Sequence, residues 1–250
     1  MSSQPDGSEQ NALRASGSSE QNALRASGSS RENGTANELS RREELLAVAT
    51  KLFAARGYHG TRINDVADVV GLNKATVYHY YASKSLILFD IYRRAADSTV
   101  AAVHDDPSWS AREAIFHFTR RLLENIANNI DGAAVYFQES PYITEWFTEE
   151  QVAYIRAAEA AVYEHVRDVI DRGIASGEFY ECDSHVLALG YIGMTLGAYR
   201  WLRPTGRRSA EEIAVEFSTA LLRGLIRDAS VREESPLGSA SSDGASATPA

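Results

Sequence analysis

The 250-residue chain has a single cysteine, Cys182, so it cannot form an internal disulfide or hold a metal ion through a set of thiolates. It has no run of 18 apolar residues that could span a membrane, and its longest candidate, Leu187–Tyr199, is too short. The N-terminus also lacks the apolar stretch of a signal peptide. These absences predict a cytoplasmic protein.

Sequence motifs that carry catalysis are missing as well. The six histidines show no HExxH spacing, and neither the GxxxxGK[ST] phosphate loop nor the GxSxG turn occurs. Helical metal sites use Glu-x-x-His spacing. Here Glu113 precedes His117 by four residues, and Glu164 directly precedes His165. We therefore expect no catalytic residues, no metal site and no cofactor.

Both ends of the chain are poor in apolar residues. Residues 1–38 are mostly Ser, Gly, Asn, Gln and Glu, and the sequence SEQNALRASGS occurs there twice in tandem, at 8–18 and 19–29. Residues 229–250 are mostly Ser, Gly, Ala, Pro and acidic residues. Such segments bury too little apolar surface to offset the entropy lost on ordering, so we expect two disordered tails.

The net charge of −9 is unevenly distributed along the chain. Between Leu39 and Leu86 there are seven Lys and Arg residues and four Asp and Glu residues, so this segment carries +3 and the remainder −12. A small basic region on an acidic body is the pattern expected when one face of a protein meets phosphates.

Between the tails, apolar residues recur with helical spacing, and no alternating strand pattern occurs. Ser40 and Glu43 form a capping box that predicts the start of the first helix. The sequence predicts an all-α fold of about nine helices. We expect a DNA-binding domain at residues 39–86 and a ligand-binding and dimerisation domain at residues 87–228.

The segment Thr61–Lys84, TRINDVADVVGLNKATVYHYYASK, predicts two short helices joined at Gly71, a helix-turn-helix. Its apolar residues can form a small shared core. Polar and aromatic residues on the second helix are candidates for reading bases in the major groove, namely Asn73, Lys74, Thr76 and Tyr78. Flanking residues are candidates for phosphate contacts, namely Thr61, Arg62, His79 and Lys84.

Structural roles are the alternatives for some of these side chains. Three tyrosines on one short helix cannot all face DNA, and we expect Tyr81 to be buried. For His79 the alternative is packing against the following helix. For Lys84 the alternative is a solvated position on the surface.

The stretches LLAVATKLFAARG and GYHGTRINDVADVVGLNKATVYHYYASKSLI resemble the DNA-binding domain of the TetR family of bacterial regulators across roughly Arg41–Ile91. The resemblance implies that Tyr80, like the four candidates above, occupies a recognition-helix position, and that Lys84 opens the next helix beside a phosphate. One departure is Ser85, where the family often has an acidic residue. RGIASGEF followed by Asp183 is similar to the end of a helix in the ligand domain of many members.

The same resemblance implies a homodimer joined through the last two helices. The sequence supports it independently, because Gly190, Gly193 and Gly197 place small residues along an otherwise apolar helix. The final helix carries an apolar stripe of Ile213, Phe217, Ala220, Leu221, Gly224 and Leu225. Packing within one subunit is the alternative for both features.

Aromatic residues are dense in the second domain, and large apolar pockets with a few polar groups are usual ligand sites. The candidate pocket residues are Phe116, Phe137, Trp146, Tyr163, Tyr199, Arg200, Trp201 and Arg203. The run RWLRP resembles regulators of lipid and steroid breakdown that sense acyl-CoA thioesters, which implies that Arg200 and Arg203 pair with CoA phosphates.

We therefore expect a repressor that binds palindromic operator DNA as a homodimer and is released by a small hydrophobic effector. The alternative is a helical small-molecule-binding or enzyme domain whose headpiece does not bind DNA.

Overall fold

A computed structural model describes residues 38–203 and 205–225. The predicted tails, with the tandem repeat, lie outside the described residues apart from residue 38, where the first helix is already formed. All regular elements of the described chain are helical, which confirms the predicted all-α fold. None of the described helices is both long and apolar enough to cross a membrane.

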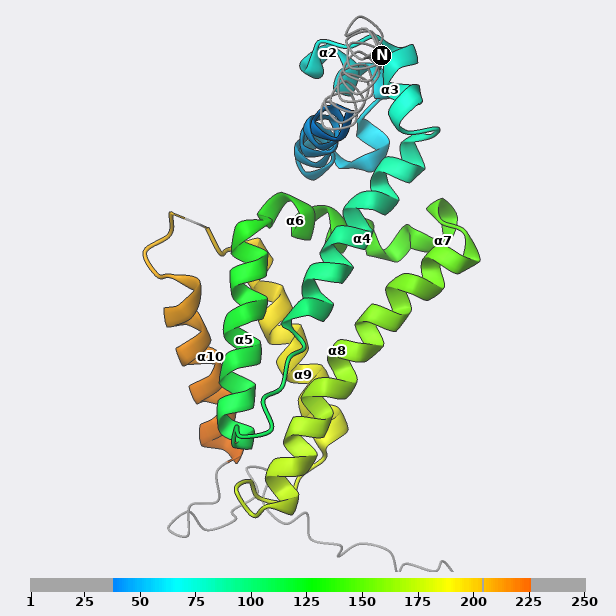
Figure 1. Cartoon of the computed structure of the whole chain (residues 1–250). Coiled ribbons are helices and arrows are strands. Elements are labelled where there is room, and N and C mark those ends of the chain that lie inside the picture. The colour runs from blue at the N-terminus through cyan, green and yellow to red at the C-terminus, as the bar shows by residue number, and fades with distance from the viewer. Residues whose placement is uncertain (1–37, 204, 226–250) are drawn as a thin grey trace, which may run out of the picture.

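A small headpiece stands at one end of the molecule (Figure 1). It consists of the first helix (residues 38–60), α2 (Ile63–Val70), α3 (Lys74–Tyr80) and the start of α4 (Lys84–Ala102). The turn between α2 and α3 is made at Gly71, whose φ of +70° is a left-handed conformation that favours glycine. Asn73 and Ser83 cap α3 and α4 through their side chains.

The body is a bundle of longer helices around α4, which runs down from the headpiece into its centre (Figure 1). The elements are α5 (Ala111–Asn128), α6 (Ile130–Glu139), η1 (Ser140–Tyr142), α7 (Ile143–Trp146), α8 (Glu149–Ala175), α9 (Ser184–Leu196), η2 (Gly197–Arg200) and α10 (Ala210–Leu225). α10 packs along α5, and α8 packs against both α4 and α9. α9 passes directly into the 3₁₀ turn η2.

The core of the headpiece continues into the body. Tyr81 is 3% exposed, which confirms its predicted burial. The same apolar cluster includes Tyr92 from α4 together with Val135, Phe147 and Ile155 from the body. The headpiece is thus held on the body by shared apolar packing.

A close helix–loop approach in the body depends on Gly173 near the end of α8. A Cβ atom at this position would lie 2.2 Å from Cδ2 of Phe179, a core residue that is 2% exposed. We expect Gly173→Ala to destabilise the protein by about 1–3 kcal/mol, because overpacking forces neighbouring groups to move. Urea unfolding measures this, with Gly60→Ala as control, since its nearest neighbour would be Arg56 Cβ at 3.7 Å. Equal stability of the two variants would contradict the prediction.

Candidate DNA-binding and effector-binding sites

The outer face of α3 carries the exposed side chains expected of a recognition helix. Lys74 and Tyr78 are exposed, and the Lys74 ammonium lies 5.8 Å from the centre of the Tyr78 ring. Asn73 Oδ1 accepts hydrogen bonds from Thr76 N (2.8 Å) and Thr76 Oγ1 (3.0 Å). The side chains of Lys74 and Tyr78 are thus exposed for the predicted base contacts. The side-chain oxygen of Asn73, in contrast, caps the N-terminus of α3.

Three further candidates lie around this face. Arg62 precedes α2 and is exposed. His79 is exposed and its ring contacts that of Tyr80, with centroids 5.6 Å apart. Tyr80 is half-buried against the headpiece core. The DNA contacts of Arg62, His79 and Tyr80 remain predictions.

The structure corrects one predicted phosphate contact, that of Thr61, and shows a further role for Lys84. Thr61 is fully buried, and its hydroxyl donates to Gly57 O (3.0 Å) and Leu52 O (3.3 Å) at the end of the first helix. The Lys84 ammonium donates to Tyr58 O (2.8 Å) and Thr61 O (3.0 Å). Burial lowers the pKa of Lys84. Both side chains therefore hold the headpiece together. Thr61 has no exposed atom for a phosphate, whereas Lys84 is partly exposed and its phosphate contact stays a prediction.

Trp146 also lies elsewhere than predicted. Its ring packs on Tyr58 and His59 of the headpiece, with centroids 5.0 and 4.6 Å away. Beside it, buried Glu139 accepts a hydrogen bond from Tyr58 N at 2.9 Å. Trp146 is therefore part of the junction between headpiece and body, and it is not among the residues that line the cavity described below.

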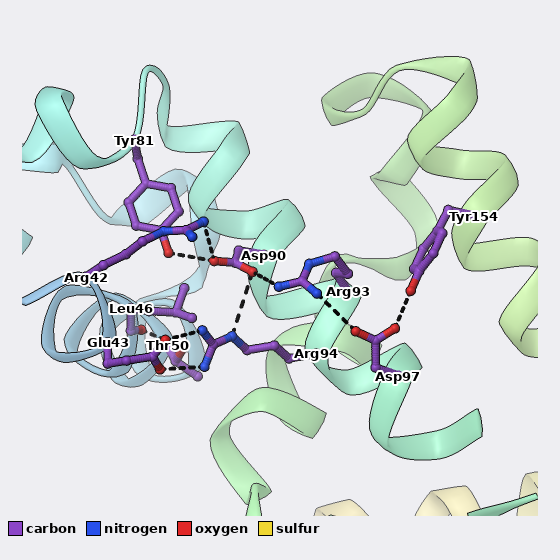
Figure 2. A network of polar contacts seen from close by, with 10 residues as sticks. All are labelled: Arg42, Glu43, Leu46, Thr50, Tyr81, Asp90, Arg93, Arg94, Asp97 and Tyr154. Atoms are coloured by element: carbon purple, nitrogen blue, oxygen red, sulfur yellow. Dashed lines mark hydrogen bonds and ion pairs between the residues drawn. The ribbon is translucent and has the colours of Figure 1, made fainter. Parts of the chain in front are cut away.

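A buried carboxylate on α4 organises this junction (Figure 2). Asp90 Oδ2 accepts hydrogen bonds from Arg42 Nη2 (2.9 Å) and Tyr81 Oη (2.7 Å), and Oδ1 accepts one from Arg93 Nη2 (2.8 Å). Burial acts to raise the pKa of Asp90. The hydrogen bonds from Tyr81 and Arg93 and the charges of Arg42 and Arg94 outweigh it, so the pKa is lowered.

The network extends from Asp90 in two directions (Figure 2). Towards the first helix, Arg94 donates to both carboxylate oxygens of Glu43, at 2.5 and 2.6 Å. Towards the body, Arg93 donates to Asp97 at 3.1 Å, and Asp97 accepts from the Tyr154 hydroxyl on α8. One polar network thus joins the first helix, α4 and α8.

A cavity of about 490 Å³ opens between α4, α5, α6, α8 and α9. Its walls are mostly apolar, and two of the predicted pocket residues, Phe137 and Tyr163, line it. The sequence analysis did not identify several of its polar residues, including Asn125, Arg156 and Glu159. No motif marks these residues, because only the packing of separate helices brings them together.

The other predicted pocket residues do not line this cavity. Tyr199 lies behind its wall, stacked on Phe137 with ring centroids 4.5 Å apart, and Phe116 packs against the body core. Arg200, Trp201 and Arg203 are exposed at the end of η2, where Arg203 Nη1 donates to Leu202 O (2.7 Å). Arg200 and Arg203 are thus not among the residues that line this cavity, and their pairing with CoA phosphates stays a prediction.

An apolar face remains uncovered on the last two helices. Val186 and Leu189 on α9 and Val215 on α10 are 59%, 53% and 48% exposed. Gly190 and Gly193 lie on the same helix as the first two, and a Cβ at either position would meet nothing within 4 Å. This face leaves room for the close approach of another helix.

An exposed recognition helix above an apolar cavity defines a DNA-binding regulator with a ligand-binding body. Two family models match the chain: "Bacterial regulatory proteins, tetR family" over residues 45–91 and "Tetracyclin repressor-like, C-terminal domain" over residues 108–225. The protein belongs to the TetR family of transcriptional regulators, as the sequence motifs indicated.

Individual relatives agree with this assignment. The transcriptional repressor KstR2 of Rhodococcus jostii is 26% identical over 76% of this chain and 94% of its own. The structure of PfmR from Thermus thermophilus is 30% identical, covers 73% of this chain and 99% of its own, and has a TM-score of 0.65. AibR, solved with isovaleryl coenzyme A and operator DNA, has the same fold, with 24% identity over 73% of this chain and 98% of its own and a TM-score of 0.62.

Proposed function

We propose that the protein is a cytoplasmic, homodimeric repressor without catalytic activity, which binds a palindromic operator and is released by a small hydrophobic effector. The observation that carries the proposal is that α4 contacts both the headpiece and the cavity. Its residue Asp90 is bonded to the headpiece, and two turns later Ala96, Ser98 and Thr99 line the cavity. A ligand that moves this helix can shift the headpieces between two arrangements, provided that it binds one arrangement more tightly.

Acyl-CoA thioesters are the effector class that we favour. AibR shows that this fold accommodates an acyl-CoA and operator DNA. The apolar cavity of about 490 Å³ lies within the range of small-molecule sites and has room for an acyl group.

The dimer is supported by the uncovered face of α9 and α10. Large exposed apolar patches on soluble proteins commonly mark interaction surfaces. Two-fold symmetry of the protein would then match two-fold symmetry of the operator, with recognition helices about 34–36 Å apart or a multiple of that spacing.

Substitutions in the headpiece test the DNA-binding part of this proposal. We expect Lys74→Ala and Tyr78→Ala to relax preference at particular base pairs, each costing about 1–3 kcal/mol on the cognate site. Arg62→Ala should weaken binding to every sequence and reduce the salt dependence by about one counterion, as expected for a lost phosphate contact.

Salt titrations on cognate and scrambled DNA measure both effects. Arg112→Ala, in the first turn of α5, is the control and should bind as the unmodified protein does. Uniform weakening by Lys74→Ala with altered base preference in Arg62→Ala would contradict the placement of the recognition helix. A complete lack of sequence-specific binding would indicate a headpiece that does not bind DNA.

A further inference from the structure

We propose that the cavity selects an uncharged carbonyl group, so that the effector is recognised as an ester or thioester and the corresponding free acid is rejected. Arg156 and Glu159 on α8 are the residues that set this preference. The inference rests on the proposed function, because it takes this cavity as the effector site.

Arg156 and Glu159 are the only charged residues among the described residues that line the cavity. They form an ion pair with 2.8 Å between Arg156 Nη1 and Glu159 Oε2, and their side chains are 60% and 36% exposed, so the pair lies where the cavity meets solvent. The other carboxylate oxygen, Glu159 Oε1, accepts a hydrogen bond from Tyr136 Oη at 2.8 Å. The charged side chains that line the cavity therefore have no net charge before any ligand binds.

Tyr136 fixes the position of the carboxylate. Burial and the charge of Glu159 raise the pKa of Tyr136, so its hydroxyl keeps its proton and remains a donor. The ring of Tyr136 is itself held by stacking on Tyr92, with centroids 4.6 Å apart, and its carbonyl accepts from Tyr92 Oη at 2.6 Å. Glu159 is thus tied to a rigid part of the core and cannot easily withdraw from the cavity.

A ligand carboxylate would meet unfavourable electrostatics in this site. It would lie close to the like charge of Glu159, which already balances the charge of Arg156. An ester or thioester carbonyl carries no charge and needs only one donor. Arg156 has five N–H groups, of which the pair with Glu159 occupies one, so donors remain for such a carbonyl.

Matched ligand pairs test the selection. The full-length protein, without DNA, is titrated at pH 8 with decanoate and methyl decanoate and with lithocholate and its methyl ester, by equilibrium dialysis and thermal shift. In at least one pair we expect the ester to bind at least tenfold more tightly than the acid. The proposal is overturned if the acids bind as tightly as their esters, or if neither ester binds.

A charge-neutralising variant tests the assigned residues. Glu159→Gln leaves Arg156 unbalanced, so the preference for the ester should fall at least tenfold, through tighter binding of the acid. The control is Glu164→Gln, which removes another i,i+3 ion pair of α8, with Arg167, outside the cavity. An unchanged preference in Glu159→Gln, or an equal change in the control, overturns the assignment.

A second substitution keeps the proposal testable if the Glu159→Gln protein fails to fold. Arg156→Gln leaves Glu159 unbalanced, and the acid should then bind still more weakly than it does to the unmodified protein. Stronger binding of the acid would overturn the proposal. Because no DNA is present, failure here is distinct from failure of the proposed function, in which ligands bind normally and operator affinity does not change.

Discussion

Replacing Asp90 with alanine should lower the free energy of unfolding by about 2–4 kcal/mol. The substitution removes the acceptor of Tyr81, Arg42 and Arg93 at once, and the side chain of Asp90 is only 5% exposed. The expected loss lies below that of a fully buried ion pair, because the two arginine side chains are each 42% exposed and can regain water.

Urea unfolding of Asp90→Ala and Asp97→Ala provides the comparison. Asp97 belongs to the same network and also pairs with Arg93, but its side chain is 45% exposed, so its loss should cost no more than about 1 kcal/mol. If both variants lose the same stability, Asp90 does not have the central place in the junction that the structure indicates.

The contribution of Asp90 should also depend on pH. Its pKa is lowered in the folded protein from an ordinary value of 3.8. A depressed carboxyl pKa stabilises the folded state fully at pH values above the unfolded pKa, and the contribution is lost as pH falls through the folded value. The stability difference between the unmodified protein and Asp90→Asn should therefore be constant near neutral pH and shrink below pH 3.8.

The headpiece could be predicted from sequence because its determinants are local. Gly71 lies between α2 and α3, Asn73 caps a helix that begins at the next residue, and Tyr81 follows its end directly. Each of these signals acts over a few residues, and the helix period indicates which side chains are buried.

The junction and the cavity could not be predicted in the same way. The bonds of Lys84 to Tyr58 and of Asp90 to Arg42 span 26 and 48 residues. The sequence therefore predicts only a phosphate contact for Lys84, because no local signal indicates the two carbonyl groups that its ammonium contacts. The pair of Tyr136 and Glu159 depends likewise on how α6 meets α8.

Adding a large charge to the uncovered face of α9 should have the largest effect on DNA binding. Gly193→Arg places a long cation where a second subunit is proposed to approach, and a Cβ at this position meets nothing within its own subunit. The monomer should therefore remain folded while the dimer dissociates. Linking two headpieces makes the second half-site contact intramolecular, so its loss should weaken binding to the full operator about 100-fold or more.

Light scattering at micromolar concentration and binding to full and half operators measure this. Binding to an isolated half-site should be unchanged, since the recognition helix lies in the other part of the molecule (Figure 1). Ala157→Arg, at an exposed position of α8, adds the same charge outside the face and should leave the dimer intact. A Gly193→Arg protein that stays dimeric would place the interface elsewhere, whereas a monomer that still binds the full operator tightly would show that the headpieces do not need to be joined.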